Sequence, residues 1–181
     1  MATKGQAAKT APVVEESIME EGFTDEETGL DLNIESDFDV DAEFKPTPLI
    51  VRGTYLASIT NVKFDPDKQA INFQFTLQDN GGVMSDGTTP VDGSTVFASV
   101  WLPKPGDEDE MTKDGRMNKR QAKINMLKQF ADGLGINMNS AKAIIEGIQN
   151  AEWIGLSCRL NITTSEYEGR VRNDVKKAVK A

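Results

Sequence analysis

Two aromatic residues on one predicted strand have the chemistry to stack against flat ring systems. Residues 94–102 (STVFASVWL) alternate in character, and the aliphatic set Val96, Ala98, Val100 and Leu102 has the opposite parity to Phe97 and Trp101. Successive side chains of a strand point to opposite faces. If the aliphatic set lines the core, both rings turn outward, where exposed rings can stack on nucleic-acid bases. The alternative is that the rings pack beneath loops or helices.

Basic residues gather in two places that suit phosphate binding. The first is the start of a predicted helix, with Arg116, Lys119, Arg120 and Lys123. The second is the last predicted strand and its partner, with Tyr167 at the turn between them and the cations Arg159, Arg170, Arg172, Lys176, Lys177 and Lys180. A solvated helix face explains the first cluster more simply. A hairpin that carries alternating cations and one aromatic ring favours contact with a nucleic acid.

The residues needed for most enzymatic and metal chemistry are missing. The chain contains no histidine and one cysteine, Cys158. This removes the commonest general base, any intrachain disulfide and any thiolate zinc site. The acidic run Asp107, Glu108, Asp109 and Glu110 lacks the alternating ligand spacing of a calcium loop. We therefore expect a non-enzymatic protein without cofactor or metal, and a carboxylate-dependent nuclease is a much weaker alternative.

The charge of the chain is strongly polarised. The net charge is -9, yet residues 1–44 hold 13 acidic and two basic residues and so carry about -11. The remaining 18 basic and 16 acidic residues give residues 45–181 about +2. Scattered apolar residues within the acidic segment cannot form a core. The sequence predicts a disordered acidic arm over 1–44, which is either a solubilising tail or an interaction segment, followed by a binding domain over 45–181.

The hydrophobic periodicity predicts five strands and two helices after the arm. Strands are expected at residues 49–64, 71–77, 94–102, 153–164 and 170–179, with a hairpin turn at Glu168 and Gly169. Helical spacing covers 117–133, stopped by Gly133 and Gly135, and 139–149, capped by Asn139 or Ser140.

The order of these elements predicts a mainly β fold with some helix. Three strands, a helical insert between strands three and four, and two further strands are the order of a five-stranded OB-fold barrel. A bend at Gly53 would let the long first strand serve both sheets of such a barrel. An open α+β sheet is the main alternative.

Three segments resemble phage-encoded single-stranded DNA-binding proteins with an OB-fold. They are RGTYLASITNVKF, INFQFTL and the ending TTSEYEGRVRNDVKKAV, within residues 48–78 and 153–179. The resemblance implies that Tyr167, Arg170, Arg172, Lys176 and Lys177 lie near the DNA path. The chain departs from the usual pattern because its acidic segment precedes the domain, whereas many such proteins carry it at the C-terminus.

These features favour non-specific binding of single-stranded DNA in phage-type replication or recombination. The acidic arm would either compete for the DNA groove or recruit replication or recombination proteins. The rival hypothesis is a virion structural or decoration protein whose arm orders against neighbouring subunits. No run approaches 18 apolar residues and residues 1–14 lack an apolar signal region. We therefore expect no membrane partner and a cytoplasmic location in the cell that makes the protein, and an oligomer is compatible with the sequence.

Overall fold

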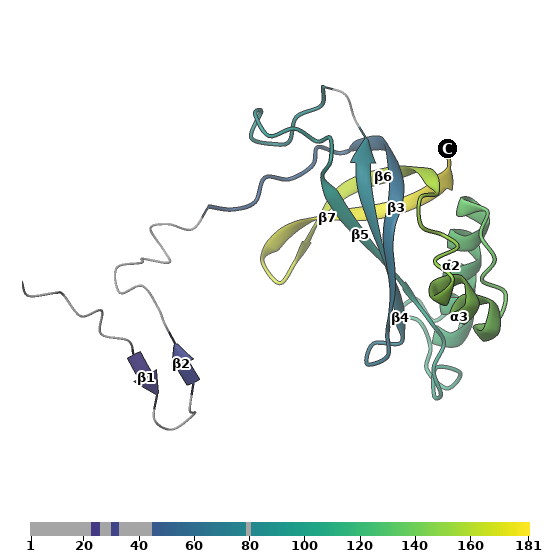
Figure 1. Ribbon diagram of the computed structural model, residues 1–181. Helices are drawn as coiled ribbons and strands as arrows, with labels where there is room; N and C mark the ends of the chain where they lie inside the picture. The colour runs from purple at the N-terminus through teal and green to yellow at the C-terminus, as the bar shows by residue number, and fades with distance from the viewer. Residues whose placement is uncertain (1–22, 26–29, 33–44, 79–80) are drawn as a thin grey trace, which may run out of the picture. The chain divides into compact units, whose positions relative to one another are not determined.

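The computed structural model describes residues 23–25, 30–32, 45–78 and 81–181 (Figure 1). The chain divides into two compact units, Met1–Pro46 and Thr47–Ala181. In the first unit, β1 (Phe23–Asp25) pairs with β2 (Leu30–Leu32) as an antiparallel ladder with Phe23 opposite Leu32. The predicted disorder of the arm otherwise lies outside the described residues.

The second unit is built on one antiparallel sheet of five strands. These are β3 (Gly53–Asp65), β4 (Ala70–Gln78), β5 (Thr95–Trp101), β6 (Ser157–Tyr167) and β7 (Arg170–Lys180). Their order in the sheet is β5-β4-β3-β6-β7. The predicted mainly β fold with a helical insert between the third and fourth of these strands is confirmed.

The sheet does not close into the barrel that the sequence predicted. Within the described part of the chain no backbone ladder joins β5 to β7, which form the two edges. The helix α2 (Lys119–Leu134) packs against both edge strands and so covers part of the opening. In Figure 1 the two helices lie together on one side, and the β6–β7 hairpin projects away from them.

The long strand β3 belongs to two ladders. Its first half, Gly53 to Ser58, pairs with β6, and residues from Leu56 onward pair with β4. The register shifts between Ile59 and Asn61, so the irregularity lies at Thr60 rather than at Gly53 as expected. Gly53 instead leaves room for a ring, since an added Cβ would lie 3.1 Å from Cε2 of Tyr55.

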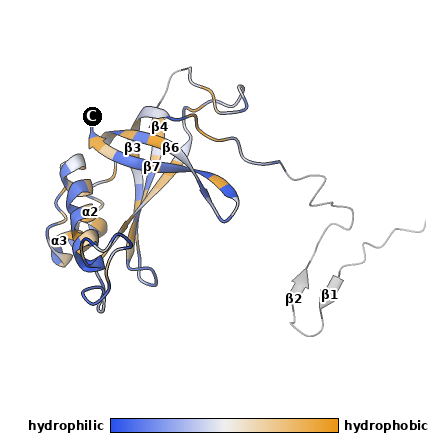
Figure 2. Cartoon of the chain, turned by 180° about the vertical axis from the view of Figure 1, so that it is seen from behind, coloured by the Kyte–Doolittle hydropathy of each residue, from blue (hydrophilic) through white to orange (hydrophobic). Residues whose placement is uncertain are grey.

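The core lies on the inner face of β4 and its neighbours. Ile71, Phe73, Phe75 and Leu77 are all buried, which confirms the alternation seen in the sequence. The ring centroid of Phe73 lies 4.8 Å from that of Phe130 on α2 and 5.8 Å from that of Trp153. Figure 2 shows hydrophobic and hydrophilic residues interleaved along the strands, as this one-sided burial requires.

Both helices form near their predicted positions. Asn118 caps α2 through its side chain, and Ser140 caps α3 (Ala141–Gln149). Gly135, with φ of 68°, ends α2, but Gly133 lies inside the helix and does not stop it. An added Cβ at Gly133 would lie 2.5 Å from the carbonyl oxygen of Ala178, so this glycine permits close packing of α2 on β7.

The fourth predicted strand begins later than expected. β6 starts at Ser157, and Trp153 lies in the turn after α3, where it is 3% exposed. Its indole packs on Gly147 of α3, at which an added Cβ would lie 2.4 Å from Cζ2 of Trp153. Among the described residues, no helix is long and apolar enough to cross a membrane.

Candidate functional site

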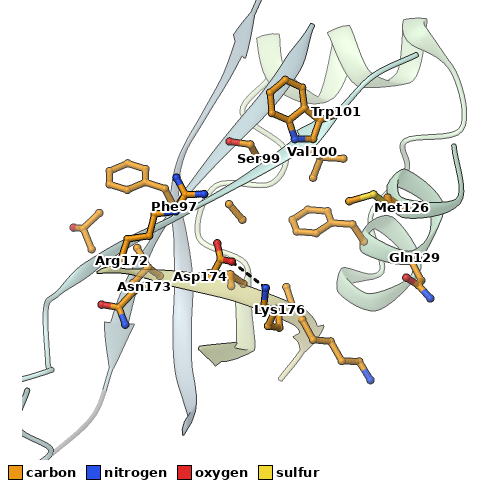
Figure 3. Close-up of a pocket in the computed structure, with 17 residues that line it drawn as sticks. Phe97, Ser99, Val100, Trp101, Met126, Gln129, Arg172, Asn173, Asp174 and Lys176 are labelled. Carbon is orange, nitrogen blue, oxygen red and sulfur yellow. Dashed lines mark hydrogen bonds and ion pairs between the residues drawn. The ribbon is translucent and has the colours of Figure 1, made fainter. Parts of the chain in front are cut away.

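A cleft of about 950 Å³ is lined by the two edge strands of the sheet, β5 and β7, which also contact each other (Figure 3). One wall is β5 along its whole length, and the other is residues 172–178 of β7. Met126, Gln129 and Phe130 of α2 line the cleft from the helical side. The cleft therefore lies where the sheet is left open.

The β5 wall presents two aromatic rings to solvent. Phe97 is 63% exposed and Trp101 is 42% exposed, whereas Val96 and Val100, each one position earlier, are buried. Ser99 shares the outward face and donates a hydrogen bond of 2.7 Å to Oδ1 of Asn72 on β4. Of the two alternatives, exposed rings or rings packed beneath loops and helices, the structure shows the first. What the rings bind stays a prediction.

The β7 wall carries two adjacent exposed lysines because its ladder with β6 contains one surplus residue. Asn161 lies opposite Lys177 and Ile162 lies opposite Val175, so Lys176 falls between two rungs. In a regular strand, Lys176 and Lys177 would point to opposite faces. With the bulge both are exposed, while Ala178 stays buried. Lys176 and Lys177 line the cleft together with Arg172.

One carboxylate sits among these cations. Asp174 lines the cleft, and its Oδ2 lies 3.0 Å from Nζ of Lys176. Figure 3 shows this contact on the β7 wall. The hydrogen bond from Lys176 holds the pKa of Asp174 below its usual value, so the carboxylate is ionised at neutral pH.

The hairpin tip continues the basic surface beyond the cleft. Glu168 and Gly169 form the predicted two-residue turn with φ values of 50° and 75°, the left-handed geometry that short hairpins favour. Tyr167 lies opposite Arg170, and Cζ of Arg172 lies 5.0 Å from the centroid of the Tyr167 ring. The guanidinium of Arg172 thus covers one face of the Tyr167 ring. The Tyr167 side chain is still 57% exposed to solvent. Arg172 thus links the tip to the cleft.

The helix cluster of predicted site residues lies elsewhere. Lys123 forms an ion pair of 2.7 Å with Asp107, which is 1% exposed and also accepts a hydrogen bond from the backbone N–H of Lys104. Lys119 pairs with Glu110 of the same loop. These contacts join the loop after β5 to α2 and give Lys119 and Lys123 a structural role.

The structure therefore brings together only part of the predicted set. Phe97, Trp101, Arg172, Lys176 and Lys177 line one cleft, and Tyr167 and Arg170 lie on the adjoining hairpin. Arg120 is exposed on α2, and Arg159 is exposed on β6 opposite Val179; neither lines the cleft.

Sequence reasoning missed Asp174 and three further cleft residues. Met126 and Gln129 are three positions apart, and that helical spacing is the signal that places them on one face with Phe130. The third, Asn173, binds the chain that enters the domain. Its Nδ2 donates to the carbonyl of Ile50 at 2.8 Å, and its Oδ1 accepts from the N–H of Ile50 at 2.9 Å.

Chemically, the cleft combines stacking surfaces on one wall with cations on the other. This combination can bind a polymer that carries flat aromatic bases on a phosphate backbone. Comparison of the chain with models of known protein families and with curated proteins found no match in either case.

Proposed function

We propose that this protein binds single-stranded DNA without sequence specificity, through the cleft between β5 and β7 and the adjoining hairpin. The observation that carries the proposal is the opposition of two exposed rings, Phe97 and Trp101, to three cations, Arg172, Lys176 and Lys177, across one cleft. Stacking on the rings requires unpaired bases, which favours a single strand over a duplex.

The fold supports the same proposal. We infer that the domain is a partly open OB-fold, because the strand order and the division of β3 between two ladders suit that architecture. OB-folds bind oligonucleotides over the face of their second and third strands. Those strands correspond here to β4 and β5, and β5 carries both exposed rings.

The wider role is part of the proposal. We infer that the protein acts in phage-type DNA replication or recombination, because the hairpin residues Tyr167, Gly169 and Arg170 carry the resemblance to proteins with that role. The acidic segment within residues 1–44 would then either compete with DNA phosphates for the domain or bind partner proteins, since its charge of about -11 opposes the slightly basic domain.

Fluorescence anisotropy of a labelled single-stranded oligonucleotide tests the proposal with the full chain. We expect binding at low salt that weakens linearly on a plot of log affinity against log salt, because bound cations release counterions. Phe97→Ala should weaken binding by about 1–3 kcal/mol, the usual effect of losing one stacked base. The control is Phe64→Ala, an exposed ring on β3 outside the cleft.

Tryptophan fluorescence provides an independent reading of the same complex. Trp101 is exposed at the cleft, whereas Trp153 is buried beside α3. Stacking of a base should quench Trp101, and the quenching should vanish in Trp101→Phe. Absence of binding at low salt, or equal losses in the Phe97 and Phe64 variants, would show that the cleft is not a DNA site.

A further inference from the structure

We propose that Asp174 gives this cleft a preference for bases that carry an amino group, so that cytosine is bound better than thymine. The inference rests on the proposed function and adds a preference that the function itself does not require. It follows from the position of one carboxylate on a wall that otherwise presents cations.

The geometry places the Asp174 carboxylate inside the cleft rather than beside it. Asp174 lines the cleft between Arg172 and Lys176, and among the described lining residues it is the only acidic one. The contact of 3.0 Å with Nζ of Lys176 fixes its Oδ2. Its cross-strand partner is Thr163 on β6, so the ladder with β6 holds its backbone in place more firmly than a loop would.

A fixed carboxylate at this point repels phosphate and attracts hydrogen-bond donors. Phosphates should therefore lie against Arg172 and Lys177, since the ammonium of Lys176 is engaged with the carboxylate, and the group that faces Asp174 should be a base or sugar. An ionised carboxylate has several lone-pair sites, so the bond from Lys176 does not exhaust its capacity to accept hydrogen bonds. The lowered pKa of Asp174 keeps it an acceptor throughout the neutral range.

The bases differ in what they offer to such an acceptor. A base stacked on a ring of β5 keeps its hydrogen-bonding edge outside the stack, where groups of the other wall can reach it. Cytosine carries the N4 amino donor, which is the usual partner of aspartate and glutamate in base contacts. Thymine carries the O4 acceptor at the same position, and this oxygen would face the carboxylate unfavourably. The two pyrimidines otherwise have similar size and stacking area.

Anisotropy titrations of the full chain with oligo-dC and oligo-dT of equal length test the preference at one salt concentration and neutral pH. We expect oligo-dC to bind roughly two- to tenfold more tightly, the effect of about one hydrogen bond. Asp174→Asn should bring the ratio of the two affinities close to one. Its absolute affinity for oligo-dT should rise, because a repulsive charge has been removed.

The matched control is Glu166→Gln, which removes one negative charge from β6 at a position outside the cleft. This variant should raise both affinities slightly and leave their ratio unchanged. Equal affinities in the unmodified chain overturn the inference without any variant, and so does a preference that survives Asp174→Asn. Absence of binding to both oligonucleotides overturns the proposed function instead, so the two failures are distinguishable.

Discussion

At the scale of single residues, lysines of this chain take two different roles. Lys176 and Lys177 are exposed on a cleft wall, whereas Lys123 is committed to a carboxylate that solvent hardly reaches. The hydrogen bond from Lys123 and that from the backbone of Lys104 lower the pKa of Asp107. The same type of side chain thus lines a cleft in one place and joins a loop to a helix in another.

The Lys123–Asp107 pair predicts an acid-sensitive contribution to stability. Because the pKa of Asp107 is lower in the folded state, the contribution is present above the usual value of 3.8 and is lost as the pH falls through the lowered value. Lys123→Met should lower the thermal unfolding midpoint at neutral pH. The midpoint of this variant should also fall less than that of the unmodified chain as the pH is lowered. Thermal melts by circular dichroism from neutral to strongly acidic pH measure both effects.

Lys128→Met is the control for this pair, since Lys128 is an exposed lysine of the same helix. Equal effects of the two substitutions at every pH would show that the pair contributes nothing specific.

The sequence allowed part of the site to be predicted at this scale. A period of two showed that Phe97 and Trp101 share a face opposite to the aliphatic residues, but it left open whether loops or helices cover that face, and the exposure of both rings decides this. The role of Lys123 could not be predicted in the same way, because its partner Asp107 is 16 positions earlier, within an acidic run that looked wholly solvated. Asp174 was overlooked because charge counts of the last strand report an excess of cations and hide a single carboxylate among them.

At the scale of elements, α2 decides how the open edges of the sheet are held. The helix contacts both β5 and β7, and its approach to β7 is closest at Gly133. A side chain at that position would meet the backbone of Ala178, which cannot move without disturbing the ladder with β6. The glycine is therefore a packing residue rather than a helix stop.

Gly133→Ala is expected to destabilise the domain, although the same change in an exposed helix stabilises it by about 0.5–1 kcal/mol. The clash with the carbonyl of Ala178 should cost about 1–3 kcal/mol, as overpacking usually does. Denaturant unfolding measures the sign of the change. An increase in stability would show that α2 does not approach β7 this closely.

Element types were easier to predict than element ends. Periodicity located all five strands of the sheet and both helices, because burial of one face imposes a regular pattern. It wrongly placed Trp153 in a strand, because an aromatic residue followed by Ile154 and Leu156 has the composition of a strand. The contact of Trp153 with Gly147, which fixes it in the turn after α3, is not visible in the sequence. The opening between β5 and β7 could not be predicted either, because it depends on packing between α2 and two strands distant in the sequence.

At the scale of the whole molecule, the acidic segment and the rest of the chain carry charge of opposite sign. Residues 1–44 carry a net charge of about -11 and residues 45–181 about +2. The net charge of the full chain, -9, therefore does not describe the charge of the domain. Charges that are not in contact act through solvent and are screened by salt within about 10 Å at 0.1 M. The acidic segment should therefore influence DNA binding most strongly at low salt.

Removal of residues 1–44 is expected to tighten DNA binding several-fold at low salt, with the gain shrinking as salt is added. Anisotropy titrations of both chains over a salt series measure this. A full-length variant with the acidic residues of this segment replaced by their amides should behave like the shortened chain. Affinities that do not change in either variant would assign the segment another role.

The surplus residue in β7 has a consequence for how this strand tolerates changes of length. Removing one residue from a paired strand normally turns every side chain beyond that point to the wrong face. Removing Lys176 would instead make the ladder regular, because Val175 and Lys177 already lie opposite the consecutive residues Ile162 and Asn161. A deletion at this position should keep the fold, whereas deletion of Val175 would place Lys176 opposite the buried Ile162 and so put a charged side chain where valine now packs. Lys176 is thus an inserted cation of the cleft wall that the domain could lose without rebuilding its core.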